Sequence, residues 1–333
     1  MGAKSGGGQI LCVVGARPNF MKIAPIMRAF SAAGPGLSAG LLHTGQHYDE
    51  AMKHAFFEQL NIPEPDMDLE VGSGTHAEQT AEIMKRFEPV LDERQPAAVL
   101  VVGDVNSTIA CALVAVKKDI PVFHVEAGLR SGDRSMPEEI NRVLTDQLSE
   151  LLFTTEESAL ENLRREGIAS DKVHFVGNVM IDTLLYNLRD AVPARRSLER
   201  AGMGDEPYGL LTLHRPSNVD DPAVLRALLQ VLADISDTTP LLFPVHPRTR
   251  SRIEAAGLRP LLDKSVITLT EPLGYLEMLG LMKDARLVLT DSGGIQEETT
   301  ALGVPCITLR ENTERPITVE QGTNTVAVSY THL

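Results

Sequence analysis

The stretch AAVLVVGDVNSTIACALVAVKKDIPVFHV, residues 97–125, decides the fold class. Its two apolar, β-branched ends, AAVLVVG (97–103) and PVFHV (121–125), have the composition of buried strands. The longer segment between them has the length and composition of a helix. A strand, a helix and a second strand in this order predict a βαβ unit, in which a helical crossover joins two parallel strands.

The same alternation continues along both halves of the chain. Strand-like runs occur at 10–15, 39–44, 97–103, 121–125, 151–155 and 173–177, and again at 208–214, 240–246, 265–270, 285–291 and 304–309. Two such series predict an α/β protein with two doubly wound, Rossmann-like domains and a ligand cleft between them. We place the N-terminal domain at residues 9–178 and the C-terminal domain at 179–333.

The composition is that of an ordinary globular protein and limits the partners. A length of 333 residues suits two domains. With 31 basic and 45 acidic residues, the net charge is −14. This charge argues against a broad nucleic-acid or anionic-membrane surface, although a small basic cleft could still hold a nucleotide.

The three cysteines favour a cytoplasmic location. Cys12, Cys111 and Cys306 lie in apolar contexts without metal-ligand spacing, so we expect buried, reduced thiols. The sequence has no apolar run of about 18 residues, the minimum for a membrane span. Its start, MGAKSGGG, lacks the apolar stretch of a signal peptide.

Polar side chains follow nearly every strand-like run. In an open parallel sheet, ligands bind outside the carboxyl ends of the strands. In the first half, these positions hold Arg17, Lys22, Gln46, His47, Asp49, Asp104, Glu126 and Glu138. In the second half, they hold His214, Arg215, His246, Arg248, the segment 291–298, Arg310 and Arg315. This recurrence predicts a ligand-binding edge in each domain.

The segment HVEAGLRSGDRSMPEEINR (124–142) concentrates charge just past a predicted strand. Its acidic residues are Glu126, Asp133, Glu138 and Glu139, and its basic residues are Arg130, Arg134 and Arg142. We interpret Glu126 and Glu138 as proton-handling groups, with the arginines orienting them or pairing with the other two acids. The alternative is a solvated loop that leads into a helix.

The segment DSGGIQEE (291–298) is the strongest anion-binding signal. Ser292 can cap the following helix, and the glycines after it let backbone N–H groups approach a phosphate at the positive end of the helix. Glu298 suits a ribose diol, while Arg315 and His246 could donate charge-assisted hydrogen bonds to a diphosphate. The alternative is an ordinary strand-to-helix turn.

The sequence supports neither a metal nor a nicotinamide cofactor. His43 and His47 have i, i+4 spacing, but Thr-Gly between them interrupts a helix and no third ligand follows. We expect a ligand contact or a structural histidine instead. The first turn, GARPNF, does not match the dinucleotide fingerprint G-x-G-x-x-G.

Taken together, the motifs resemble one family. GARPNFMKIAP, TGQHYDEAM, GDVNST, HVEAGLRSGDRSMPEEINR, HRPSN, DSGGIQEE and ERP occur in this order over nearly the whole chain, and the set is similar to that of non-hydrolysing UDP-N-acetylglucosamine 2-epimerases. The resemblance implies a GT-B fold and interconversion of UDP-N-acetylglucosamine (UDP-GlcNAc) and UDP-N-acetylmannosamine (UDP-ManNAc). It further implies elimination of UDP to 2-acetamidoglucal, no cofactor, a homodimer and a role in surface polysaccharide synthesis.

The resemblance also assigns roles to individual residues. The catalytic positions match Asp104, Glu126, Glu138 and His214. The substrate- and UDP-binding positions match Arg17, Lys22, His246, Ser292, Gly293, Glu298 and Arg315. Gln46 and His47 are the expected contacts for allosteric activation by UDP-GlcNAc.

Two other functions share parts of this pattern. A nucleotide-sugar glycosyltransferase would use the same fold and UDP site but would require an acceptor, and a UDP-sugar sensor would bind without turnover. The set Asp104, Glu126, Glu138 and His214 favours the epimerase over both. The chain stops at VAVSYTHL, where the family normally continues, so we expect the C-terminal domain to be truncated at its end.

Overall fold

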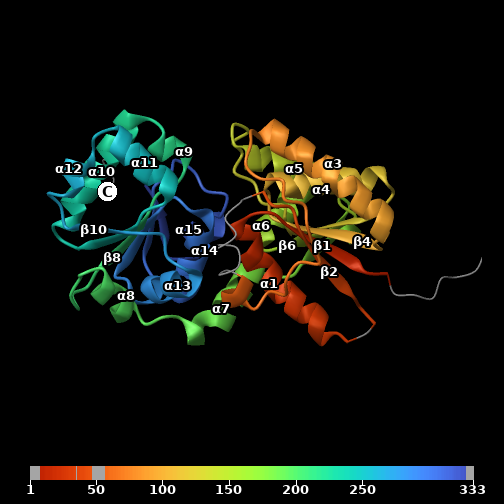
Figure 1. Ribbon diagram of the computed structural model, residues 1–333, viewed down its shortest axis with the longest axis horizontal. Coiled ribbons are helices and arrows are strands. Elements are labelled where there is room, and N and C mark those ends of the chain that lie inside the picture. Colours follow the sequence, from red (N-terminus) through yellow and green to blue (C-terminus); the bar gives the residue numbers. More distant parts are fainter. Residues whose placement is uncertain (1–7, 35, 47–56, 328–333) are drawn as a thin grey trace, which may run out of the picture. The chain divides into compact units, whose positions relative to one another are not determined.

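The structure is a computed structural model that describes residues 8–34, 36–46 and 57–327. The chain divides into two compact units, Met1–Thr183 and Leu184–Leu333. The division falls within helix α7 (Val179–Asn187), and the boundary expected between residues 178 and 179 lies at the start of that helix. Each unit contains one parallel sheet with helices on both faces, which confirms the predicted class (Figure 1).

The first unit has a seven-stranded parallel sheet in the order β3-β2-β1-β4-β5-β6-β7. The strands are β1 (Ile10–Val14), β2 (Ala39–His43), β3 (Met67–Asp68), β4 (Ala98–Val102), β5 (Val122–Ala127), β6 (Leu151–Thr154) and β7 (Val173–Phe175). The strand order reverses between β1 and β4. Ligands of doubly wound folds bind at this switch point, outside the carboxyl ends of the strands.

Helices cover both faces of the first sheet. They are α1 (Arg17–Ala32), α3 (His76–Arg94), α4 (Asn106–Lys117), α5 (Pro137–Leu148), α6 (Glu157–Arg165) and the 3-10 turn η1 (Ser170–Lys172). In Figure 1, α3, α4 and α5 lie on one face and α1 on the other. All five residues of β4 are buried, as expected for a central strand that is covered on both sides. Helix α3 begins with a capping box, in which the Thr75 and Glu78 side chains each accept from the other's backbone N–H.

The second unit has a six-stranded parallel sheet in the order β10-β9-β8-β11-β12-β13. The strands are β8 (Gly209–Thr212), β9 (Leu241–Pro244), β10 (Ile267–Thr270), β11 (Leu287–Thr290), β12 (Cys306–Thr308) and β13 (Asn324–Val326). The helical elements are η2 (Leu188–Asp190), α8 (Ala194–Arg200), α9 (Pro216–Val219), α10 (Pro222–Ser236), α11 (Pro247–Ala255), α12 (Arg259–Leu262), α13 (Tyr275–Asp284), α14 (Gly293–Leu302) and α15 (Pro316–Glu320).

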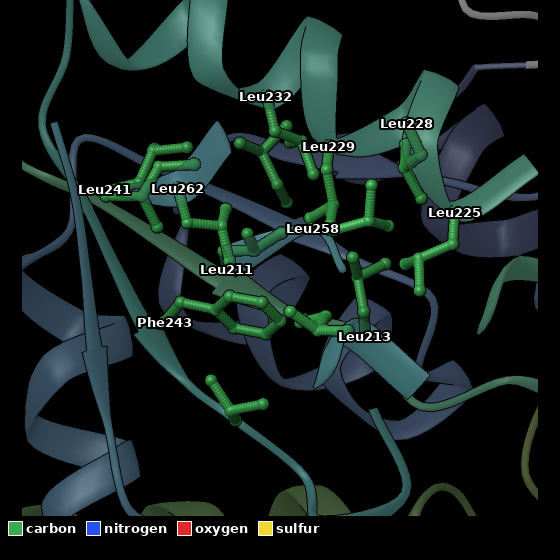
Figure 2. Close-up of a cluster of buried hydrophobic side chains, with 14 of the residues drawn as sticks. Leu211, Leu213, Leu225, Leu228, Leu229, Leu232, Leu241, Phe243, Leu258 and Leu262 are labelled. Atoms are coloured by element: carbon green, nitrogen blue, oxygen red, sulfur yellow. The ribbon is translucent and has the colours of Figure 1, made fainter. Parts of the chain in front are cut away.

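Helix α10 shows how the second unit builds its core. Asp221 caps the helix by accepting from the backbone N–H groups of Ala223 and Val224. The inward-facing leucines follow the spacing of one helix face: Leu225, Leu228, Leu229 and Leu232. Figure 2 shows them packed over Leu211 and Leu213 of the β8 segment and Phe243 of β9. Each fully buried side chain of this size contributes about 1.5–3 kcal/mol to folding.

The sequence did not indicate two of the strands. Strand β3 has two residues and β13 has three, and both are edge strands. They lack the apolar run that marks an internal strand, because an edge strand is covered less completely. Helix α14 ends at Gly303, which has φ of +72° in the left-handed region. Among the described residues, no helix is long and apolar enough to cross a membrane.

Candidate functional site

The switch point of the first unit is organised by Asn19, which the sequence analysis did not single out. Its Oδ1 accepts from the backbone N–H groups of Gly15 (3.0 Å) and Ala16 (3.2 Å), and its Nδ2 donates to the carbonyl of Val102 (3.0 Å). One amide thus joins the end of β1 to the end of β4. Its position inside the first-strand turn GARPNF was the only available signal.

Lys22 and Glu126 form a buried ion pair beside this junction. The Lys22 Nζ lies 2.8 Å from the Glu126 Oε1, and the two side chains are only 5% and 2% exposed. Gly103, with φ of +66°, leaves room for the ammonium group, because a Cβ there would lie 2.8 Å from Nζ. Glycine is therefore required both by the backbone conformation and by the close approach.

Glu126 is held by an unusual backbone conformation. Its φ is +74°, which is rare for a residue with a side chain. The register between β5 and β6 shifts between Val125 and Ala127, so Glu126 lies at a β-bulge. Bulges redirect a side chain, and such strain persists where the surrounding structure enforces it, often at functional sites. The bulge presents Glu126 to Lys22.

Asp104 is a more accessible carboxylate at the end of β4. Arg142 donates to its Oδ2 at 2.7 Å and to the Glu139 Oε2 at 2.9 Å. Arg142 is buried, whereas the Asp104 side chain is 21% exposed. Asp104 can therefore contact a ligand while its charge and orientation are held from behind.

The two glutamates at the start of α5 differ in their surroundings. Glu139 is buried and accepts from the backbone N–H groups of Ser131 and Gly132, both at 3.0 Å. It holds the loop after β5. Glu138 lies in the same first turn but is partly exposed. This difference separates a structural acid from one that can reach a ligand.

The interpretation of the arginines in residues 124–142 is correct for Arg142 and wrong for Arg130. Arg130 pairs with Asp146 (2.7 Å) and Glu166 (2.6 Å), which lie outside that segment. Burial raises the pKa of Asp146, but His124 and Arg130 outweigh this and lower it below its usual value. Arg130 therefore neutralises a buried acid and does not orient the acids of its own loop.

The predicted regulatory contacts are only partly described. The Gln46 side chain is buried, and its Oε1 accepts from the backbone N–H (3.1 Å) and the hydroxyl (2.7 Å) of Ser107 in the first turn of α4. His47 lies outside the described residues, as does the side chain of Arg17. His43 is buried and its Nδ1 lies 2.9 Å from Asp68, which supports the structural interpretation of this histidine.

In the second unit, Asp291 positions His214. Asp291 follows β11, is fully buried, and accepts from the backbone N–H groups of His214 (3.0 Å) and Arg215 (2.9 Å). Burial raises its pKa, but the hydrogen bonds from His214 and Arg215 lower it below the usual value. The His214 Nδ1 lies 2.8 Å from its Oδ1, and the ring is 41% exposed. This leaves the His214 Nε2 as the nitrogen that can exchange a proton with a ligand.

His246 lies close to His214 in the second unit. The two ring centres are 6.0 Å apart. His246 caps α11, and its Nδ1 accepts from the backbone N–H of Arg248 at 3.2 Å. With Nδ1 engaged in this way, Nε2 is the ring nitrogen that can donate to a ligand.

The start of α14 is shaped for close approach. Ser292 occupies the N-cap position, but its hydroxyl makes no capping bond, so the expectation that it caps the helix is wrong. Its backbone N–H donates instead to the Thr290 hydroxyl at 3.0 Å. A Cβ on Gly293 would lie 2.5 Å from the Glu314 Oε1, so only glycine lets this carboxylate lie against the first turn.

A cluster of three arginines and two carboxylates adjoins α14. Arg310 lies 2.8 Å and Arg215 3.6 Å from Glu314, while Arg315 lies 3.3 Å from Glu297. Burial raises the pKa of Glu314, but Arg310, Arg315 and Arg215 together lower it to about 2. Within this cluster the arginines outnumber the carboxylates, and the cluster lies beside the positive end of a helix. This is the electrostatic pattern of an anion site.

Glu298 lies deeper in the same helix. The Tyr275 hydroxyl donates to its Oε1 at 3.1 Å, and both side chains are buried. Burial raises the pKa of Glu298 to about 7, even though the Tyr275 hydrogen bond opposes the shift. A hydrogen-bonding ligand that favours its ionised form would lower that pKa on binding.

The structure thus groups the predicted residues separately within each unit. In the first, Asp104 and Glu126 lie at adjacent strand ends, Lys22 reaches Glu126 from α1, and Glu138 lies on α5. In the second, His214 adjoins His246, and Arg315 pairs with α14 near Ser292 and Gly293. The sequence analysis gave no positioning role to five side chains that hold these groups: Asn19, His124, Asp146, Asp291 and Glu314. Within the described residues, no three potential ligands gather in a way that could hold a metal ion.

Comparison with known proteins identifies the family. Residues 31–332 match the family model described as UDP-N-acetylglucosamine 2-epimerase. The chain belongs to this family. A UDP-N-acetylglucosamine 2-epimerase of Methanocaldococcus jannaschii is 47% identical over 94% of this chain and 86% of that protein. The predicted enzyme class, an isomerase of this family, is confirmed.

Solved structures extend the match to three dimensions. The crystal structure of the M. jannaschii UDP-GlcNAc 2-epimerase in complex with UDP-GlcNAc and UDP has a TM-score of 0.89, with 46% identity over 96% of this chain and 88% of that chain. This likeness confirms the GT-B fold class. One relative has another substrate in its name: a UDP-2,3-diacetamido-2,3-dideoxy-D-glucuronate 2-epimerase of Pseudomonas aeruginosa is 43% identical over 95% of this chain and 87% of that protein.

Proposed function

We propose that this family member interconverts UDP-GlcNAc and UDP-ManNAc by eliminating UDP to form 2-acetamidoglucal and then adding UDP back. The observation that carries the proposal is Glu126, a buried carboxylate that a strained bulge directs to Lys22 beside the Asp104 loop. A binding module gains nothing from such strain. The names of similar relatives support UDP-GlcNAc as the substrate.

The chemistry explains why several acid and base groups are required. The sugar C2–H bond has no adjacent carbonyl group to acidify it. As the C1–O bond breaks, positive charge develops at C1 and makes the C2 proton more acidic. A base takes that proton, the C2–H electron pair forms the C1=C2 bond, and the C1–O pair leaves with UDP. Returning a proton to the opposite face of C2, as UDP adds to C1, completes the inversion.

The first unit supplies the proton-transfer groups in this proposal. Glu126, Asp104 and Glu138 are carboxylates from neighbouring segments, and they differ in burial and in their cationic partners. Different surroundings give carboxylates different proton affinities, which allows one to act as base and another as acid. Lys22 pairs with Glu126 at 2.8 Å, and Arg142 pairs with Asp104 at 2.7 Å.

The second unit supplies the leaving-group site. Arg315 and the first turn of α14 face developing negative charge on the diphosphate, with Arg215 and Arg310 held nearby by Glu314. His214, oriented by Asp291, presents Nε2 for a hydrogen bond or proton transfer to the departing oxygen. Glu298 accepts from the ribose hydroxyls.

Further parts of the proposal rest on the family resemblance. They are activation by UDP-GlcNAc through Gln46 and His47, a homodimer, a cytoplasmic location and supply of ManNAc for surface polysaccharide. The three free, buried cysteines, Cys12, Cys111 and Cys306, agree with a reducing compartment.

Incubation with UDP-GlcNAc alone tests the proposal. We expect UDP-ManNAc to form without an acceptor, as separated by anion-exchange chromatography. A glycosyltransferase would leave UDP-GlcNAc unchanged until an acceptor is added, and a sensor would bind without product. A parallel incubation with UDP-2,3-diacetamido-2,3-dideoxy-D-glucuronate tests the specificity, and faster turnover of this sugar would overturn the choice of substrate.

A further inference from the structure

His124 makes two hydrogen bonds in the interior of the first unit. It lies on β5, two residues before Glu126, and is fully buried. Its Nε2 lies 2.8 Å from the carbonyl oxygen of Gly103, and its Nδ1 lies 2.6 Å from the Asp146 Oδ1. None of the roles derived above uses this residue.

The two acceptors determine where the protons are. A carbonyl oxygen only accepts, so Nε2 must carry a proton. Asp146 also accepts from the Gly128 N–H (3.0 Å) and from Arg130 (2.7 Å) through its other oxygen, a pattern that favours an ionised carboxylate. Nδ1 therefore donates as well. The geometry corresponds to a buried imidazolium paired with a buried carboxylate.

This pair connects the loops that carry the proposed catalytic carboxylates. Gly103 immediately precedes Asp104, and its φ of +66° makes room for Lys22, the partner of Glu126. On the other side, Asp146 holds the N–H of Gly128, just after the bulge at Glu126. A shift of the imidazole would move both strand ends. Because the ring is fully buried, it cannot itself touch a substrate.

We propose that His124 is a positioning residue for the reaction: as a doubly protonated imidazole, it joins the Gly103 carbonyl to Asp146 and so sets the placement of Asp104 relative to Glu126. This role rests on the proposed function of those carboxylates. It adds to the reaction a side chain that makes no contact with substrate.

Two substitutions separate the two hydrogen bonds. In His124→Gln, the amide nitrogen can occupy the position of Nε2 and donate to the Gly103 carbonyl. In His124→Asn, it can occupy the position of Nδ1 and donate to Asp146 only. We expect His124→Asn to lower kcat by about 10²-fold, as displacement of catalytic groups by about 1 Å can do. His124→Gln should retain at least about fivefold more turnover than His124→Asn.

UDP affinity and melting temperature complete the comparison. The affinity should stay within about twofold of the wild type in both variants, because the change is confined to the first unit. A merely structural role predicts lower melting temperatures with equal turnover per folded molecule in the two variants. Equal losses, or no loss in either, would overturn the proposal.

A measurement on the unchanged protein covers the case in which neither variant folds. Nitrogen-15 NMR of histidine-labelled protein should show one ring with both N–H protons protected from solvent, because both nitrogens of the buried His124 ring face acceptors. The buried His43 differs, because among the described residues its Nε2 has no hydrogen-bond partner, whereas both ring nitrogens of His124 are hydrogen-bonded. Absence of a doubly protonated ring would overturn the proposal. If the wild type forms no UDP-ManNAc while this signal is present, the proposed function fails but the imidazolium link stands.

Discussion

The carboxyl edges of the two sheets carry opposite kinds of chemistry on the same topology. In the first unit, the carboxylates Glu126 and Asp104 are each held by one cation, Lys22 or Arg142. In the second unit, three arginines, Arg215, Arg310 and Arg315, cluster around the two carboxylates of Glu297 and Glu314. A doubly wound sheet thus fixes where side chains gather, and the charge balance among them decides whether the edge suits proton transfer or anion binding.

The carboxyl edges of the two sheets also differ in the backbone features that position their side chains. In the first unit, the close placement of the Lys22 and Glu126 side chains depends on Gly103 and on the strained bulge at Glu126. Both Gly103 and Glu126 have positive φ. In the second, it depends on a glycine at the start of α14, against which Glu314 lies. Strain orients a single group, whereas a helix start offers several N–H donors to a charged ligand. This difference leads us to expect that variants of the two units affect different measured quantities.

The largest expected effect is that of Glu126→Gln on turnover. Loss of a general acid or base lowers kcat by about 10²–10⁴-fold. UDP affinity should change by less than about twofold, because the proposed UDP site lies in the second unit. Melting temperature must be measured alongside, since the variant leaves Lys22 buried without its partner charge. Glu161→Gln, at an exposed ion pair, is the control and should retain normal turnover. Normal turnover in Glu126→Gln would remove it from the mechanism.

The adjacent acids of α5 provide a matched pair. Glu138→Gln should lower kcat by about 10²-fold with little change in melting temperature, because Glu138 is partly exposed. Glu139→Gln should instead lower stability by about 3–5 kcal/mol, since it leaves the buried Arg142 without one of its two carboxylate partners. Denaturant unfolding and steady-state kinetics on both variants test this. The opposite assignment would make Glu139 the catalytic acid and Glu138 the structural one.

Arg315→Ala should reveal the second unit's role in binding. A lost charge-assisted contact to the diphosphate corresponds to about 1.5–3 kcal/mol, or roughly tenfold or more in UDP affinity. Calorimetric titration with UDP measures it, and Arg252→Ala, at an exposed position on α11, serves as the control. Unchanged affinity in a folded Arg315→Ala protein would place the diphosphate elsewhere.

The smallest expected effect is a dependence of UDP affinity on pH. With its pKa raised to about 7, Glu298 is mostly protonated at pH 6 and mostly ionised at pH 8. Ribose hydroxyls bind the ionised form, so affinity should rise with pH across this window, by up to about tenfold. UDP also titrates near pH 6, and this contribution should persist in Glu298→Gln. Identical pH profiles for the wild type and this variant would contradict the assignment.

Glu298 should affect folding in the opposite direction. A carboxyl group whose folded-state pKa lies above its unfolded value near 4.3 contributes stability that is fully present below pH 4.3 and is lost as pH rises through 7. Without ligand, Glu298→Gln should therefore gain stability relative to the wild type between pH 4.5 and pH 8. Unfolding curves at several pH values check the sign.

Sequence patterns located the strand ends well because long apolar runs mark buried strands. They found Asp104, Glu126 and His214 because these residues follow such runs directly. They could not show that Arg130 pairs with Asp146, or that Arg142 serves Asp104, since those contacts join residues 16 and 38 positions apart. Nor could they show that the Ser292 hydroxyl makes no capping hydrogen bond at the start of α14. A local sequence pattern predicts a helix or a strand. Which side chains pair with each other depends on which helices and strands pack together in the fold.

Proton NMR of UDP-GlcNAc with the purified protein in D2O tests the central claim most directly. Elimination and re-addition require the C2 proton to leave the sugar and a solvent-derived one to replace it. We predict that UDP-ManNAc forms as the minority species with deuterium at C2. UDP-ManNAc that retains its original C2 hydrogen would contradict the proton-transfer mechanism and, with it, the role assigned to the first unit.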